Sequence, residues 1–108
     1  MATILQAAKL ALRITSANTS YDTEIQDLID SASADMIESG VSSSKAYSYD
    51  DPMIRRAVIT FCKANFGWDN PDAERLGQSF AAQVTKIAVT PEYKAISEAA
   101  EEEDDALS

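Results

Sequence analysis

The chain has 108 residues, and its 18 acidic and nine basic residues give a formal net charge of −9. This length fits one domain that buries about 65% of its unfolded surface, enough for a hydrophobic core without disulfide or metal support. The sequence has no histidine and one cysteine, Cys62. These counts exclude Ser–His and Cys–His nucleophile pairs, an intramolecular disulfide and a cysteine-rich zinc site. No apolar run approaches the ~20 residues of a membrane span, and the N-terminus lacks a secretory signal pattern. We therefore expect a small helical protein that is not an enzyme, holds no cofactor or metal and contacts no membrane.

Two helices are predicted in the first third of the chain. The first covers about residues 3–12, where Thr3 and Gln6 fit a capping box. A polar loop of small residues follows. The second covers about residues 22–39, with Asp22 in the N-cap position. Its apolar residues recur at helical spacing and form one stripe: Ile25, Leu28, Ile29, Ala32, Met36 and Ile37.

Two further helices are predicted in the second half. The third begins at Pro52, after Asp51 as an N-cap carboxylate, and ends before Gly67. The fourth covers about residues 71–88, with Asn70 as its cap. Both have apolar stripes that should face the core: Ile54, Ala57, Val58, Phe61 and Cys62 in the third, and Leu76, Phe80, Val84 and Ile87 in the fourth.

The remaining segments complete an all-α fold class. Residues 41–50 form a predicted loop that is longer than the usual ~4–6 residues. Such a loop either takes part in binding or only connects two helices. Pro91 opens a short C-terminal helix over about residues 91–99. No segment alternates with a period of two, so no strand is expected. The prediction is one domain over residues 1–97, with four main helices and this short fifth one.

The C-terminal residues 98–108 differ in composition from this domain. They hold six acids and no base, which leaves 12 acids and nine bases, a net charge of −3, in residues 1–97. A block of like charges repels itself and has little apolar surface to bury, so this acidic tail is expected to be disordered alone. It is either a solubilising tail or a segment that orders against a partner.

A basic strip is predicted near the corner between the third and fourth helices. The strip consists of Arg55, Arg56, Lys63 and Arg75. Four bases in an acidic chain attract the phosphates of a nucleic acid only weakly, so a nucleic-acid site is disfavoured. The strip is either ordinary solvated charge or a contact with an acidic protein surface, including that of a neighbouring copy. Trp68, in the turn, is either a core residue or an interface anchor. The candidate subunit or partner interface comprises Arg55, Arg56, Lys63, Trp68, Arg75 and Tyr93.

The order and spacing of four segments resemble a known family. These segments are "AKLALRI" (8–14), "DTEIQDLIDSASADM" (22–36), "YDDPMIRRAVITFCKANFGWDNPDAERL" (49–76) and "PEYK" (91–94). Together they are similar to the head–tail connector (head completion or adaptor) family of long-tailed bacteriophages, over about residues 3–94. The most specific part is the Asp-Pro helix start, the run to "NFG" and the following "DNPDAERL".

The resemblance implies a small α-helical structural protein of the virion, made in the host cytoplasm and placed at the capsid vertex. It implies a homo-oligomeric ring, twelve-fold on a twelve-fold portal, between the portal protein and the stopper or tail-completion protein. DNA would pass through the ring during packaging without sequence-specific binding, and an acidic channel wall would repel its phosphates. The family has no short catalytic or ligand signature to carry over to this sequence. The alternative, suggested by the charge of −9, is a small acidic helical regulator or nucleic-acid mimic that binds a partner protein.

Overall fold

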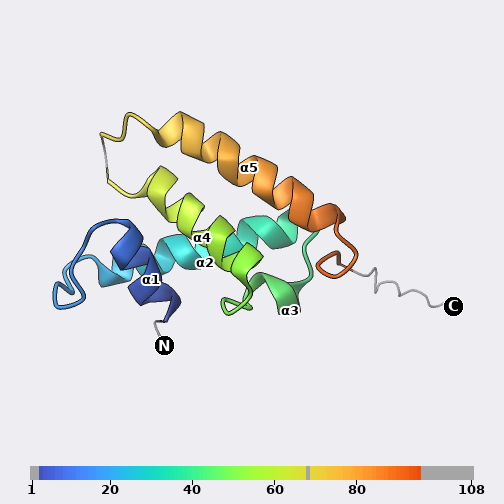
Figure 1. Ribbon diagram of the computed structural model, residues 1–108, viewed down its shortest axis with the longest axis horizontal. Helices are drawn as coiled ribbons and strands as arrows, with labels where there is room; N and C mark the ends of the chain where they lie inside the picture. The colour runs from blue at the N-terminus through green and yellow to red at the C-terminus, as the bar shows by residue number, and fades with distance from the viewer. Residues whose placement is uncertain (1–2, 68, 96–108) are drawn as a thin grey trace, which may run out of the picture.

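A computed structural model describes residues 3–67 and 69–95, and this part of the chain folds into five helices with no strand (Figure 1). The all-α fold class is confirmed, and the four predicted main helices correspond to α1, α2, α4 and α5. Trp68 and the acidic tail lie outside the described residues, so the domain boundary at residue 97 stays a prediction. The helices are α1 (Ile4–Ala11), α2 (Asp22–Glu38), α3 (Ser43–Ala46), α4 (Pro52–Asn65) and α5 (Ala73–Val89).

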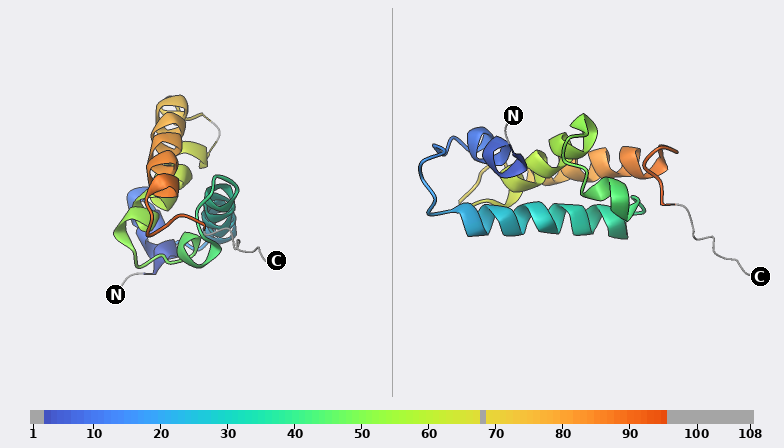
Figure 2. Two further views of the ribbon diagram at one scale, coloured as in Figure 1. Left: turned by 90° about the vertical axis from the view of Figure 1, so that its right-hand side faces the viewer. Right: turned by 90° about the horizontal axis from the view of Figure 1, so that it is seen from below.

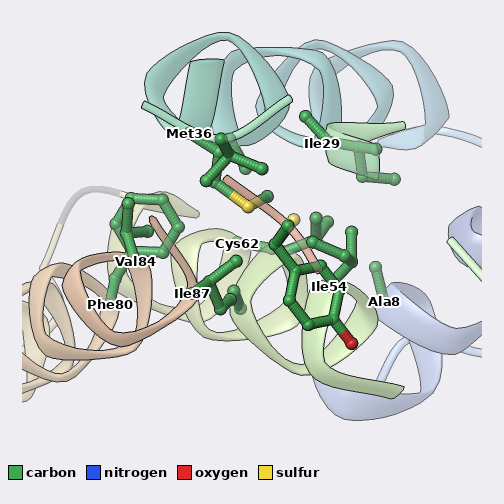
Figure 3. Packing of buried hydrophobic residues seen from close by; sticks show 14 of the residues in the cluster. Ala8, Ile29, Met36, Ile54, Cys62, Phe80, Val84 and Ile87 are labelled. Atoms are coloured by element: carbon green, nitrogen blue, oxygen red, sulfur yellow. The ribbon is translucent and has the colours of Figure 1, made fainter. Parts of the chain in front are cut away.

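The core is built around α4, which packs against α1, α2 and α5. Two views at right angles show α5 running along α4, with α2 on another side of α4 (Figure 2). The predicted apolar stripes point into this core, except at Leu76, which is only partly buried and does not belong to it. Figure 3 shows side chains from four helices meeting there: Ala8 of α1, Ile29 and Met36 of α2, Ile54 and Cys62 of α4, and Phe80, Val84 and Ile87 of α5.

Two predicted helix starts are confirmed. At α1, the Thr3 hydroxyl accepts from the Gln6 backbone N–H at 3.1 Å, and the Gln6 side chain accepts from the Thr3 backbone N–H at 3.1 Å. At α4, Asp51 Oδ1 accepts from the backbone N–H of Met53 at 2.9 Å, ahead of Pro52. These bonds satisfy backbone donors that have no partner within the helix.

The N-cap predicted for α2 is wrong. Asp22 is the first helical residue, Tyr21 takes the cap position, and no side-chain bond caps this helix. The Asp22 carboxylate instead lies 2.8 Å from Nζ of Lys9, which is 3% exposed. Lys9 also donates to the backbone carbonyl of Ser16 at 3.2 Å. A buried ammonium needs a counter-charge, so the carboxylate is used to join α1 to α2 rather than to cap a helix.

The start of α5 also differs from the prediction. The helix begins at Ala73, with Asp72 rather than Asn70 in the cap position. The Asn70 side chain donates to the carbonyl of Lys63 at 2.6 Å and accepts from the Asp72 N–H at 3.0 Å. Asn70 therefore closes the turn between the two helices, as Asn side chains often do, and Pro71 lies in that turn.

The segment 41–50 is an ordered connection that contains α3, which the sequence analysis missed. The buried Ser33 hydroxyl of α2 donates to the carbonyl of Ala46 at 2.8 Å and lies 2.9 Å from the Tyr49 hydroxyl. These contacts attach the segment to α2. A four-residue helix has too little apolar periodicity to be visible in a sequence, so its tertiary contacts are what define it.

The predicted short C-terminal helix is wrong for its described part. Residues 91–93 form a turn, and Lys94 makes an isolated antiparallel bridge with Val41. The Ser42 N–H donates to the Tyr93 carbonyl and the Ala95 N–H donates to the Gly40 carbonyl, each at 2.8 Å. These bonds to residues 40–42 satisfy the Tyr93 carbonyl and the Ala95 N–H, which would otherwise be paired within a helix. Residues 96–99 lie outside the described residues.

Candidate interaction surface

The outward face of α4 carries the predicted basic residues. Ile54 and Val58 point to the core, whereas Arg55, Arg56 and Lys63 lie around the other side of the helix. These three bases line one shallow groove, and α4 contains no acid. The groove wall also includes apolar atoms, so a partner can bury surface there as well as pair charges. Its lining is Asp50, Pro52, Arg55, Arg56, Ile59, Thr60 and Lys63.

Arg55 is held in place by the chain itself. Its Nε donates to the Tyr49 carbonyl at 3.0 Å, and one terminal nitrogen lies 3.9 Å from an Asp50 carboxylate oxygen. The Asp50 side chain is 96% exposed, so this ion pair is weak. Arg56 and Lys63 are exposed and form no ion pair within residues 3–67 and 69–95. Arg56 and Lys63 are therefore the bases best placed to meet an outside acid.

A second groove, between α4 and α5, extends the basic surface. Arg56 lines both grooves, and Lys86 of α5 adds an exposed ammonium. Within the described part of the chain, Oε1 of Gln83 in this groove is buried and accepts no hydrogen bond. Lys86 is not among the predicted interface residues, because it lies 30 residues from Arg56 and only the packing of α5 on α4 brings them together. We call Arg55, Arg56, Lys63 and Lys86 the basic face.

The other candidate interface residues lie apart from this face. Arg75, in the first turn of α5, lines neither groove and faces Asp72 at 3.6 Å. Tyr93 is only 6% exposed and belongs to the core, where its hydroxyl and ring are already in contact with the chain. Trp68 is outside the described residues. The interface role of these three residues stays a prediction.

Tyr93 fastens the C-terminal segment to the start of α4. Its hydroxyl lies 3.0 and 2.8 Å from the two carboxylate oxygens of Asp51. The hydrogen bond, burial and the Asp51 charge raise the pKa of Tyr93 to about 12. Burial raises the pKa of Asp51, but hydrogen bonds from Tyr93 and from the Met53 and Ile54 N–H groups outweigh it, so the pKa falls below its usual value. One carboxylate thus caps α4 and holds residues that are 42 positions away.

Replacing Tyr93 by Phe tests this contact through alkaline unfolding. Tyrosine has an ordinary pKa of about 10 in the unfolded chain, and the raised folded value means that the folded state keeps the proton longer. The stabilisation is therefore complete below pH 10 and is lost as the pH rises toward 12. We expect the urea-midpoint advantage of the wild-type chain over Tyr93→Phe to shrink across this range. A constant advantage from pH 8 to pH 12 would contradict the contact.

The opposite charge gathers on α2. Its exposed acids lie off the buried stripe, and α2 contains no base. Asp35 and Glu38 line a notch against α5, with Phe80 and Val84 among its apolar members. Asp27 and Asp35 are not among the interface residues predicted from the sequence. Their common face could have been found from their helical spacing. The exposed acids are Glu24, Asp27, Asp30, Asp35 and Glu38.

The described residues include one cysteine, Cys62, which is buried. Burial raises the pKa of the Cys62 thiol to about 12, so it stays protonated and unreactive at neutral pH. Among residues 3–67 and 69–95, no group of three or more acidic or cysteine side chains could hold a metal ion. Within the same residues, every helix is too short or too polar to cross a membrane. The prominent features of the surface are its charges, which suit binding to another macromolecule.

Comparison with known proteins identifies the family. The sequence profile of a family described as phage connector protein matches residues 4–94, which is most of the chain and nearly all of its described part. This chain belongs to the phage connector family. The resemblance seen in the sequence is confirmed, and the connector is a structural component of a phage virion. Neither a curated protein nor a solved structure matches the chain.

Proposed function

We propose that this connector forms a ring at the capsid vertex, between the portal protein and the stopper or tail-completion protein, and extends the DNA channel. The proposal is carried by the family match over residues 4–94, which covers all five helices. A ring of identical subunits uses a head-to-tail contact that closes by rotation, so each copy presents two different surfaces. The basic face and the acidic side of α2 are two such surfaces.

The charge of the chain suits a channel. A net charge of −9 per copy disfavours a tight grip on the DNA phosphates, so DNA can pass without sequence-specific binding. Repeated around a ring, this charge also repels neighbouring copies, and contacts between opposite charges offset that repulsion. Twelve copies would match a twelve-fold portal. The packaged DNA would then run through the ring into the tail.

The acidic tail is proposed to order against the portal or the stopper. Residues 98–108 carry six of the 18 acids, and a self-repelling segment of this kind gains order when basic groups of a partner neutralise it. Amide hydrogen exchange of the tail should slow when the partner is added. Exchange that is unchanged by portal and by stopper would assign the tail to solubility alone.

Light scattering after size exclusion tests the proposed function. The chain is run alone and then with the portal protein of the same phage, which is the partner that the proposal requires. Co-elution at near-portal stoichiometry, or a ring formed by the chain alone, is the expected result. A monomer that ignores the portal would overturn the proposal. The alternative, an acidic regulator or nucleic-acid mimic, would then be tested by tight one-to-one binding to a DNA-handling protein.

A further inference from the structure

Four acids of α2 share one face of the helix. Glu24, Asp27, Asp35 and Glu38 stand at positions i, i+3, i+11 and i+14, which an α-helix of 3.6 residues per turn places in one row. All four are exposed. We call these four residues the acidic row. Asp30, on the same helix, lies about 100° around the helix from the row, given the 100° turn per residue.

The acidic row and most of the basic face have no counter-charge within the chain. In residues 3–67 and 69–95, the ion pairs are Lys9–Asp22, Lys45–Glu92, Arg55–Asp50 and Arg75–Asp72. None of them involves the acidic row, and none involves Arg56, Lys63 or Lys86. The acidic row and the three bases Arg56, Lys63 and Lys86 therefore keep their charge available for an outside partner.

The two surfaces lie on different sides of the molecule and share no groove. The buried stripes of α2 and α4 meet in the core, so the exposed sides of the two helices face outward in different directions (Figure 2). One side of the molecule is thus acidic and another is basic. A two-fold contact through either surface alone would oppose like charges, whereas a head-to-tail contact joins acid to base.

We propose that the acidic row of one copy docks on the basic face of the next copy, and that this contact builds the connector ring. The proposal rests on the ring function proposed above and names its subunit contact. Asp27 and Asp35 are eight residues apart on α2, as are Arg55 and Lys63 on α4, so each pair spans about 12 Å along its helix axis. Two facing helices can therefore pair both charges at once.

Apolar surface accompanies the charges mainly on the basic side, where the face borders Pro52 and Ile59. In the notch beside the acidic row, Ala81 is exposed, whereas Phe80 and Val84 belong to the core. Exposed ion pairs alone give little affinity, because water and salt screen them. In this contact the charges determine which surfaces meet and how the two helices align. Burial of the apolar atoms adds to the binding free energy.

Cross-linking between variants that each carry one added cysteine tests the contact even if the complex is short-lived. One chain carries Asp35→Cys and the other carries Arg56→Cys or Lys63→Cys, and a short bis-maleimide joins cysteines that meet. Wild-type chain is the blank, because Cys62 is fully buried. Asp30→Cys is the matched control, on the same helix but off the row. We expect the acidic-row and basic-face variants to join about tenfold faster than two like variants do, and more slowly in high salt.

Equal rates for mixed and like pairs would overturn the contact, as would an Asp30→Cys rate equal to that of Asp35→Cys. A charge swap gives a second, independent readout. Asp27→Lys with Asp35→Lys, and Arg56→Glu with Lys63→Glu, should each abolish assembly on the portal. An equimolar mixture of the two should restore it, because alternating copies pair again. Failure of the mixture to assemble counts against the contact.

The two proposals can fail separately. Co-elution with the portal together with non-specific cross-linking would keep the connector function and reject this contact. Specific cross-linking by a chain that ignores the portal would keep the contact and reject the function.

Discussion

Replacing Ile54 by Ala is expected to lower the free energy of unfolding by about 2–5 kcal/mol. Ile54 is fully buried in α4, the helix that contacts α1, α2 and α5 (Figure 3). Removing its outer carbons deletes dispersion contacts and leaves a cavity that the surrounding helices fill only in part. Urea unfolding followed by far-UV circular dichroism measures the loss.

Ile59→Ala is the matched control for this substitution. Ile59 is on the same helix but borders the basic face, where it is only partly buried. The same change there should lower the free energy of unfolding by about 1 kcal/mol or less, because less apolar surface leaves water on folding. A loss at Ile59 as large as that at Ile54 would contradict the assignment of the core face of α4.

Replacing Lys9 by Met is expected to lower the free energy of unfolding by about 1–3 kcal/mol. The change removes the ammonium that lies 2.8 Å from Asp22 and donates to the Ser16 carbonyl. Methionine fills the space of the stem but leaves the carboxylate without its counter-charge. The side chain of Asp22 is 31% exposed, so water relieves part of this penalty and keeps the effect below that of a fully buried pair.

Two further variants isolate the ion pair at Lys9. Arg75→Met breaks the pair with Asp72, in which both side chains are more than half exposed, and should change stability by less than about 1 kcal/mol. The double variant Lys9→Met with Asp22→Leu should recover part of the loss, because no unpaired charge is left. Equal losses in Lys9→Met and Arg75→Met would show that burial adds nothing to the pair.

Periodic apolar residues made the main helices predictable from the sequence. The stripe of α2 and that of α4 repeat over several turns, and only one face of each helix can be buried against the rest. The Asp51–Pro52 start was equally visible, because the Asp51 carboxylate accepts from a backbone N–H of the first turn and Pro52 has a backbone angle that suits the first helical position. Both signals come from residues close together in the sequence, and the helices form where those residues predict them.

The errors share a different cause. Asp22 was expected to cap its own helix, but a buried lysine 13 residues earlier uses its carboxylate. Residues 91–95 were expected in a short helix, yet Lys94 bridges Val41 and Tyr93 donates to a carboxylate 42 positions away. Such pairings depend on the path of the intervening chain, which residue spacing does not encode.

The candidate surface was predictable in part. Arg55, Arg56 and Lys63 lie within one helix, and their common side follows from its period. Lys86 joins them only through the packing of α5 on α4. The acidic row could have been found from its helical spacing, but its position on a different side from the basic face needed the fold.

The most direct test of the connector function is the particle made without this chain. Electron microscopy would examine particles of the phage that encodes it, after its gene is disrupted and again after the wild-type gene is supplied in trans. We predict filled or partly filled heads that lack tails, and tailed particles after complementation. Tailed, infectious particles in normal numbers without the chain would contradict the account.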